Sequence, residues 1–340
     1  MNRRNATFST IIPAFCMITL IFDSKTAISG AKDGLLLCLQ TVIPCLLPFF
    51  ILSSLLTSSL SGMAIKILQP IRKLCKIPDG AESILLIGLI GGYPIGAQSI
   101  AQAWKADSLT KQDAHRLLGF CSNAGPSFIF GILGSVFSKG IAVWLLWAIH
   151  IFSAVCVGCV LPAVNKRSQC RMAPQRIDLV MAVNRSILSL GNVCGWIILM
   201  RVIISFFNRW FFWLVPDVLR AYLIGILELT NGCHVLTGIK SEATRFIISS
   251  GILGFGGICV GLQTISATHG LGTGMYFPGK LLQGTFSLLL STILAALLYD
   301  QAITQLWQLL CCSIILAAAT VAYICYRFRK KGSFFHKACV

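Results

Sequence analysis

Near the middle of the chain's first half stands Gly91-Gly92-Tyr93-Pro94-Ile95-Gly96-Ala97-Gln98-Ser99-Ile100, inside an apolar segment that runs from residue 84 to residue 104. Its three glycines and one proline oppose a continuous helix, because proline lacks a backbone donor and glycine costs about 1 kcal/mol relative to alanine. In a bilayer, interrupted backbone survives only where protein buries it or where it lines a cavity. The stretch therefore predicts a broken or re-entrant membrane segment.

The same pattern occurs a second time. Residues 256–265 repeat the order G-G-x-x-x-G-x-Q-[ST]-I, 165 positions later. Paired glycine-interrupted segments in two halves of a membrane protein indicate a transport site. Small residues four apart, such as Gly92 and Gly96, also allow close helix packing. Packing alone does not require glutamine at the same place twice, so Gln98 and Gln263 favour a functional site.

The composition is that of an integral membrane protein. Of the 340 residues, 56% are hydrophobic and 11% are charged, and the mean hydropathy is +0.81. We therefore predict an all-α, polytopic membrane protein of about eight to ten transmembrane segments, built as two related halves that each contain a glycine-interrupted segment. The bilayer is the expected partner, a homo-oligomer stays open, and the net charge of +17 does not indicate nucleic acid, because the basic residues cluster beside apolar spans.

The sequence predicts neither an enzyme nor a metal or cofactor site. The 15 cysteines lie mostly within apolar runs, where cysteine behaves as a small hydrophobe. No histidine or acid stands beside the C-x-x-C at 156–159 to complete a metal site. The chain also lacks a phosphate-binding loop, a zinc-protease motif and a nucleophile elbow.

Charge divides the chain into four parts. We predict a first membrane repeat (1–164), a basic cytoplasmic linker (165–185), a second membrane repeat (186–326) and a basic cytoplasmic tail (327–340). If each glycine segment is a re-entrant hairpin, every strongly basic cluster falls on one side, with both termini in the cytoplasm. The offset of 165 favours parallel repeats, while an inverted repeat with crossing glycine segments stays open.

Two further motifs carry polar groups into apolar surroundings. Residues 121–127, Cys-Ser-Asn-Ala-Gly-Pro-Ser, indicate either a broken helix whose free N–H groups suit an anion or an ordinary proline kink. Arg201 and Glu228 lie inside predicted spans, where a charge costs about 2.5–3.5 kcal/mol. Arg201 is either a functional contact or a side chain that reaches the interface. Glu228, followed by Thr230 and Asn231, favours a carboxylate that faces a cavity.

Four motifs in this order resemble one known family: residues 91–97, 123–128, 228–232 and 256–263. The family is the sporulation integral membrane proteins of the YlbJ (stage V sporulation protein V) type, within the nucleoside-recognition Gate domain group. The resemblance extends from about residue 34 to residue 327. It implies a transporter of dipicolinic acid, a small aromatic dianion, in the outer forespore membrane.

The resemblance also implies where the substrate binds. Backbone N–H groups at the broken helices, together with amide side chains, suit carboxylate oxygens, and Tyr93 suits stacking on the aromatic ring. The implied contacts are Gly91, Gly92, Tyr93, Gly96, Gln98, Asn123, Gly125, Ser127, Glu228, Thr230, Asn231, Gly256, Gly257, Gly261 and Gln263.

Two alternatives stay open: a carrier of nucleosides or other small polar solutes, and a non-transporting scaffold for spore envelope assembly. A transporter predicts a polar cavity where the two glycine segments meet, whereas a scaffold predicts a packed, dry interior there.

Overall fold

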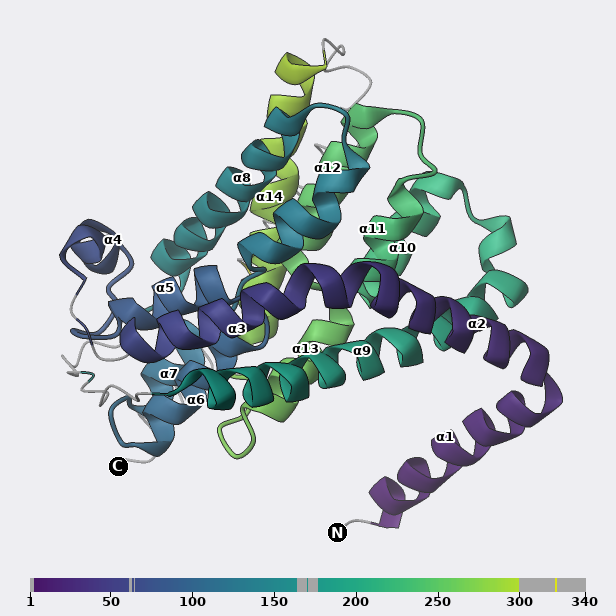
Figure 1. Cartoon of the computed structure of the whole chain (residues 1–340), viewed down its shortest axis with the longest axis horizontal. Helices are drawn as coiled ribbons and strands as arrows, with labels where there is room; N and C mark the ends of the chain where they lie inside the picture. Colours follow the sequence, from purple (N-terminus) through teal and green to yellow (C-terminus); the bar gives the residue numbers. More distant parts are fainter. Residues whose placement is uncertain are drawn as a thin grey trace.

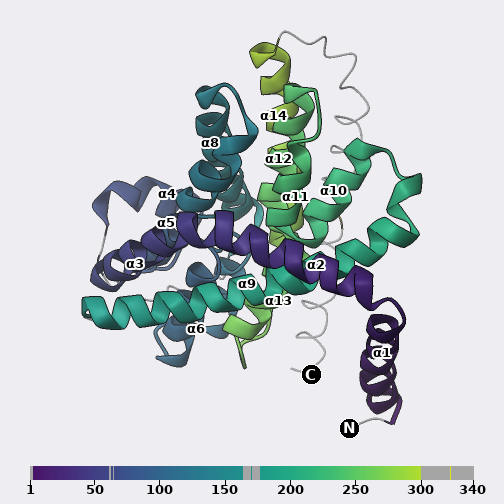
Figure 2. The ribbon, with the colours of Figure 1, turned by 45° about the vertical axis from the view of Figure 1, so that its right-hand side comes forward.

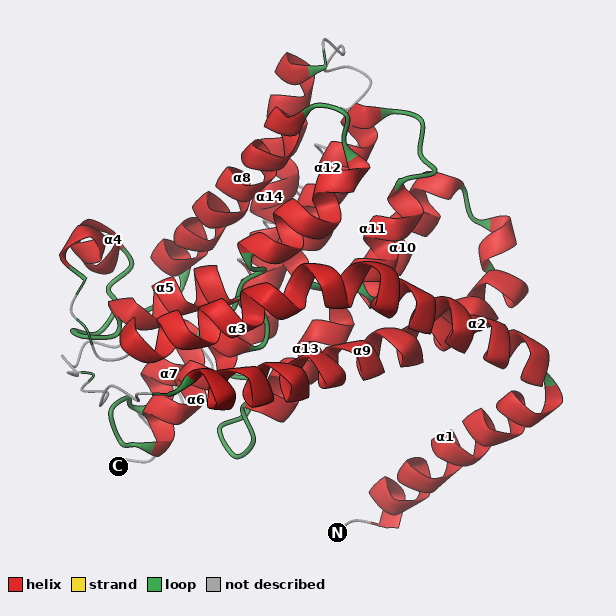
Figure 3. Ribbon diagram, in the orientation of Figure 1, coloured by secondary structure: helices red, strands yellow, loops and turns green. Residues whose placement is uncertain are grey.

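The computed structural model describes residues 3–60, 63, 65–163, 170, 177–299 and 322, and this part of the chain is helical without a strand (Figure 3). Five of its helical segments are long and apolar enough to cross a membrane: Ser24–Leu60, Gly140–Val160, Leu179–Trp210, Glu242–Ala267 and Tyr276–Leu298. The prediction of an all-α, polytopic membrane protein is confirmed. The predicted last span, 303–326, and the tail lie outside the described residues, apart from Ala322.

Two long helical segments run side by side across the molecule (Figures 1 and 2). After α1 (Arg3–Phe22), the first of them combines α2 (Ser24–Leu37), the π-helical turn η1 (Cys38–Val42) and α3 (Ile43–Leu60). The second is α9 (Leu179–Trp210). They are antiparallel, because Gly30 lies against Ser205 and Cys38 against Cys194. At about 1.5 Å per residue both are longer than the ~30 Å hydrocarbon core, so each is long enough to span it even when tilted.

The first glycine segment is a helical hairpin. It follows η2 (Lys66–Leu68) and α4 (Gln69–Leu74), and it consists of α5 (Glu82–Gly91) and α6 (Ile95–Lys105). The two arms pack against each other so closely that a Cβ atom on Gly96 would lie 2.9 Å from the Gly88 Cα. Gly92 forms the tip with φ +72, a conformation that favours glycine. The hairpin predicted for this segment is confirmed.

A second hairpin stands where we expected one span, from residue 211 to about residue 235. After η5 (Phe212–Leu214), α10 (Asp217–Leu227) and α11 (Leu229–Leu236) fold back on each other around Glu228. Their arms meet at two glycines, Gly225 and Gly232, whose backbones are in direct contact. The prediction of a single span here is wrong, because these paired glycines allow two short helices to pack in its place.

Two interrupted helices cross the molecule between the hairpins. The first runs from α7 (Lys111–Leu117) through an irregular break to the short helical turns η3 (Ser127–Ile132) and η4 (Leu133–Val136). The second is α12 (Glu242–Phe255), which α13 (Gly257–Ala267) continues onward, as Figure 1 shows.

The second glycine segment was expected to turn back as a hairpin, and this expectation is wrong. Gly256 and Gly257, each with φ +82, interrupt the helix, but Cys259 stands where the first copy has Pro94. Cysteine keeps the backbone N–H that proline lacks, so the helix resumes after a single break.

The two halves are arranged as an inverted repeat. The ring of His115, in the last turn of α7, lies 2.7 Å from the Leu271 carbonyl, just beyond α13, while the Ser138 N–H donates to Glu242 at the start of α12 (3.0 Å). The two interrupted helices are therefore antiparallel. The remaining long helices, α8 (Gly140–Val160) and α14 (Tyr276–Leu298), are antiparallel too, because Lys139 stacks on Tyr299. The parallel repeat favoured by the sequence offset is therefore wrong.

Three segments gather at one end of the molecule: residues 65–81, 105–116 and 158–163. We call it the basic end, because residues 65–81 carry Lys66, Arg72, Lys73 and Lys76. Buried Arg116 donates to the carbonyls of Gly158 (2.7 Å) and Leu161 (3.1 Å). Cys170, in the linker, donates its N–H to Asp79 (2.7 Å). The loops before α5 and after α8 therefore lie together, which agrees with the common side that the charge pattern predicted for them.

Candidate functional site

The four interruptions meet at the centre of the molecule. A Cβ atom on Gly92, at the tip of the first hairpin, would lie 2.8 Å from the Gly125 nitrogen in the α7–η3 break. Gly256, in the α12–α13 break, lies against the Tyr93 hydroxyl, and Gly257 lies against the backbone of Leu229 in the second hairpin. Glycine is needed at Gly92 because the two backbones approach closely, and at Gly256 and Gly257 because their φ of +82 disfavours a side chain.

A cavity of about 50 Å³ lies between these four elements, and we call it the motif cavity. The helices α3 and α9 close it with the apolar side chains Leu46, Phe50 and Val193. The sequence-predicted residues that line it are Gly91, Gly92, Tyr93, Gly125, Ser127, Glu228, Thr230 and Gln263. A space this small holds water but no organic solute, for which pockets of about 300–1,000 Å³ are usual. The structure is therefore a closed arrangement of the hairpins.

Glu228 is the acid of the motif cavity. Its carboxylate accepts hydrogen bonds from the N–H groups of Thr230 (2.9 Å) and Asn231 (2.6 Å) and from the Asn231 side-chain amide (2.7 Å). Only 3% of the residue is exposed. These contacts cap the first turn of α11, where the helix dipole favours a negative group. The glutamate therefore shapes the hairpin tip and faces the cavity at the same time.

Arg201 joins this hairpin to the long helices. Its guanidinium lies 3.4 Å from the Asn231 side-chain oxygen and 3.6 Å from the Asp33 carboxylate on α2. The sequence left open whether Arg201 reaches the interface or contacts the site. The structure leaves the Arg201 side chain 17% exposed and in contact with Asn231, the residue whose amide donates to Glu228.

A buried polar network supports the tip of the first hairpin. Lys280 of α14, with 0% exposure, donates to Gln283 (2.7 Å) and Asn123 (3.3 Å), and its ammonium lies 5.2 Å from the centre of the Tyr93 ring. Gln283 also donates to Asn123 (2.9 Å). On α8, His150 accepts the N–H of Ala124 in the break (3.1 Å). Lys280 forms no ion pair with an acid among the described residues.

Sequence reasoning missed Lys280, Gln283 and His150. A signal for His150 existed, because a histidine in the middle of the predicted span 141–161 is unusual. Lys280 gave a weaker signal, because it stands at the beginning of the predicted span 279–298, where a lysine is expected at the interface.

The other sequence-predicted residues do not line the motif cavity. Asn123 and Asn231 hold the Lys280 network and the Glu228 carboxylate. Gly256 and Gly257 form the break in the second interrupted helix. The remaining three serve elsewhere: Gly96 in hairpin packing, Gly261 against the Phe277 ring, and Gln98 in a separate crevice.

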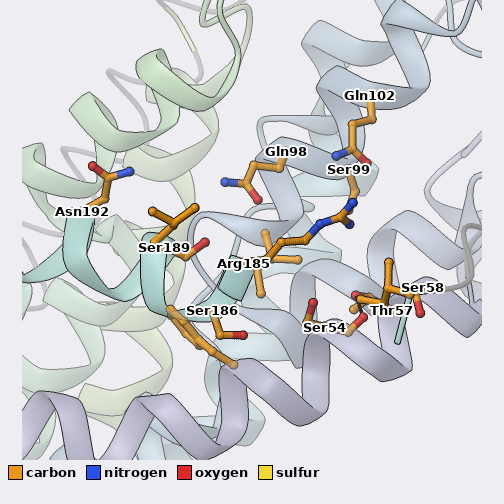
Figure 4. Close-up of a pocket in the computed structure, with 14 residues that line it drawn as sticks. Ser54, Thr57, Ser58, Gln98, Ser99, Gln102, Arg185, Ser186, Ser189 and Asn192 are labelled. Carbon is orange, nitrogen blue, oxygen red and sulfur yellow. Dashed lines mark hydrogen bonds between the residues drawn. The ribbon is translucent and has the colours of Figure 1, made fainter. Parts of the chain in front are cut away.

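This second space, which we call the polar crevice, has a volume of about 340 Å³ and lies between α3, α6 and α9. Figure 4 shows Arg185 reaching from α9 toward Ser99 of α6. Phe50 lines both the crevice and the motif cavity, so the two spaces adjoin at this residue. The polar residues that line the crevice are Ser54, Thr57, Ser58, Gln98, Ser99, Gln102, Arg185, Ser186, Ser189 and Asn192.

The described residues contain no group of three or more His, Cys, Asp or Glu side chains placed to hold a metal ion. Cys75 and Cys159 bring their sulfur atoms within 3.8 Å at the basic end. Burial raises the pKa of the Cys75 thiol to about 12, so this thiol stays protonated at neutral pH.

Comparison with known proteins agrees with the motif resemblance. No protein-family model matches the chain, and no solved structure matches it. The sporulation integral membrane protein YlbJ of Bacillus subtilis is 26% identical over 332 aligned positions, which cover 84% of this chain and 81% of that protein. Similarity over most of both chains confirms the resemblance, and the chain is a relative of the YlbJ-type sporulation integral membrane proteins.

Proposed function

We propose that this protein is a transporter that moves a small anionic solute, dipicolinate in the first instance, across the outer forespore membrane during sporulation. The observation that carries the proposal is the meeting of four interrupted elements around Tyr93, Ser127, Glu228 and Gln263. Broken helices that converge from both halves of an inverted repeat are the arrangement in which secondary transporters bind solutes. The relative's name supports a role in sporulation.

The interior favours transport over a scaffold. A scaffold predicts a packed and dry centre, but the motif cavity stands next to a polar crevice of about 340 Å³. The buried hydroxyl of Tyr93 has no hydrogen-bond partner among the described residues. An unpaired buried hydroxyl costs about 1–3 kcal/mol, so a solute that pairs with it gains affinity.

The charges near the motif cavity favour an anion. Lys280 brings a buried amine to within 5.2 Å of the centre of the Tyr93 ring, and when this amine is protonated its charge acts in surroundings where charge interactions are stronger than in water. The negative charge of Glu228 is balanced by three donors at the start of α11. Glu228 is also the cavity group suited to hold a coupling proton or metal cation alongside the anion.

The inverted arrangement supplies a route across the bilayer. The first hairpin comes from the basic end and the second from the opposite end, and both tips reach the motif cavity. Movement of either hairpin would open the cavity to one side only. By the positive-inside rule the basic end faces the cytoplasm, which in a sporulating cell is that of the mother cell.

The test is the dipicolinate content of spores from a strain that lacks this protein, with synthesis of the acid measured in the mother cell. The proposal expects normal synthesis and spores with little of the acid. Normal spore content would overturn it and would turn attention to nucleoside uptake or to a structural role.

The site assignment has its own test. Replacing Gln263, which lines the motif cavity, with alanine should lower dipicolinate uptake, and Gln98→Ala should lower it through the polar crevice. Uptake unchanged in both variants would show that these residues do not bind the solute.

A further inference from the structure

The charge that lines the polar crevice is positive. Among the described residues that line it, Arg185 is the charged one and none is an aspartate or a glutamate. The other polar groups are hydroxyls and amides, such as Ser99, Gln102 and Ser189, which donate hydrogen bonds readily. A planar guanidinium surrounded by neutral donors matches a carboxylate, which it can bind through two parallel hydrogen bonds.

The crevice has the size and position of a solute site. Its volume of about 340 Å³ lies within the range of about 300–1,000 Å³ that small-molecule pockets occupy, whereas the motif cavity is far smaller. It extends along α6 from Ile95 to Gln102, one turn before the end of that helix at the basic end, and it shares Phe50 with the motif cavity. A solute in the crevice therefore stands one side chain away from the motif cavity.

We infer that the polar crevice is a binding station for a small organic carboxylate, in which Arg185 holds the anion before Phe50 moves aside. This station lies outside the motif cavity and precedes it on the path from the basic end. The inference rests on the proposed function for the identity of the anion and for the path past Phe50, whereas the binding of a carboxylate at Arg185 stands on the crevice itself.

Thiol labelling tests the inference without any need for transport. Ser189→Cys places a thiol in the crevice next to Arg185, and its reaction rate is measured with a negatively charged and with a positively charged methanethiosulfonate. The natural cysteines are accounted for by subtracting the rates of the chain without the added cysteine. Vesicles of phosphatidylcholine alone keep anionic lipid headgroups from acting as the ligand.

We expect the anionic reagent to be favoured, and we expect Arg185→Gln to lower this preference about fivefold to tenfold, as one unit charge at short range should. Arg185→Lys should retain much of the preference. The matched control is Arg209→Gln, which removes an exposed arginine from the other end of α9 and should change nothing. Dipicolinate should slow the labelling of Ser189→Cys at least severalfold.

The outcomes separate this inference from the proposed function. A charge preference that survives Arg185→Gln, or a Ser189→Cys thiol that neither reagent reaches, overturns the anion station. A preference that depends on Arg185, without protection by dipicolinate, supports the station and counts against dipicolinate as the solute. Protection that appears only when anionic lipid is added assigns the crevice to a lipid headgroup and overturns the solute station.

Discussion

Glu228 caps α11 and lines the motif cavity, and the proposed role in holding a proton or cation makes opposite demands on it. As the cap of α11 it needs a full set of donors, and as a cavity group it needs to be available to a proton or cation. Both are possible because a carboxylate has more acceptor sites than the three that these donors occupy. Binding of a proton or cation to the Glu228 carboxylate would therefore alter the hydrogen bonds that shape the hairpin tip.

Replacing Glu228 with glutamine should impair transport strongly. The substitution keeps the volume but turns one acceptor into a donor, which faces an N–H group and leaves it unpaired at a cost of about 1–3 kcal/mol. We expect dipicolinate uptake into proteoliposomes to fall about tenfold. The control is Glu242→Gln, which removes a carboxylate that caps the Ser138 turn away from the motif cavity. Equal uptake by Glu228→Gln and the wild type would exclude a role for this carboxylate.

We expect Lys280 to contribute to anion uptake through the positive charge of its protonated amine. Lys280→Met keeps most of the side-chain volume and removes the positive charge behind Tyr93, so uptake of an anion should fall severalfold. Lys139→Met is a matched control, because Lys139 also stacks on a tyrosine ring (5.4 Å) but is exposed at the opposite end. Uptake in the two variants is measured at equal protein content. An uptake rate in Lys280→Met equal to that of the wild type would show that the Lys280 side chain does not contribute to anion binding.

At the residue scale, sequence reasoning located the interruptions but not their support. Glycine and proline are local signals, so the breaks at Gly92, Gly125 and Gly256 could be predicted from the chain alone. The Lys280 network could not, because its partner Asn123 lies 157 residues away in sequence. A contact over that separation exists only after the two interrupted helices and α14 have come together.

At the scale of elements, the two hairpins depend on glycines that bring their arms together. Gly232→Ala should destabilise the protein by about 1–3 kcal/mol or more, because the new methyl group would meet the Gly225 backbone, which cannot move aside. Gly191→Ala in α9 is the control, because a Cβ atom there meets no atom within 4 Å and alanine favours the helix. Thermal unfolding in detergent is the measurement. Equal loss in both variants would contradict the close contact of the hairpin arms.

The two glycine segments share a sequence pattern but do not form the same structural element. The repeated pattern of glycines and glutamine predicted two equivalent hairpins, yet the first copy turns back and the second continues. The re-entrant turn of the second half is centred on Glu228, where the glycines lie seven residues apart and give no compact motif. The predicted grouping of basic loops survived this error, because exchanging one hairpin for one crossing helix leaves the number of crossings unchanged.

At the scale of the whole molecule, the inverted arrangement predicts sidedness. In cells that carry the protein in the plasma membrane, a membrane-impermeant thiol reagent should label Lys240→Cys, near the end opposite the basic end, from outside. It should label Lys105→Cys, at the basic end, only after the cells are permeabilised. The two positions are exposed, so each serves as the accessibility control for the other. The reverse pattern would place the basic end outside and contradict the proposed orientation.

The central claim is that the meeting point of the two hairpins and the two interrupted helices passes a small anion across a membrane. Its most direct test is the uptake of radiolabelled dipicolinate by proteoliposomes that contain the purified protein. We predict saturable uptake that exceeds both protein-free vesicles and vesicles with Glu228→Gln. Uptake by the folded wild-type protein no greater than that of protein-free vesicles would contradict the claim.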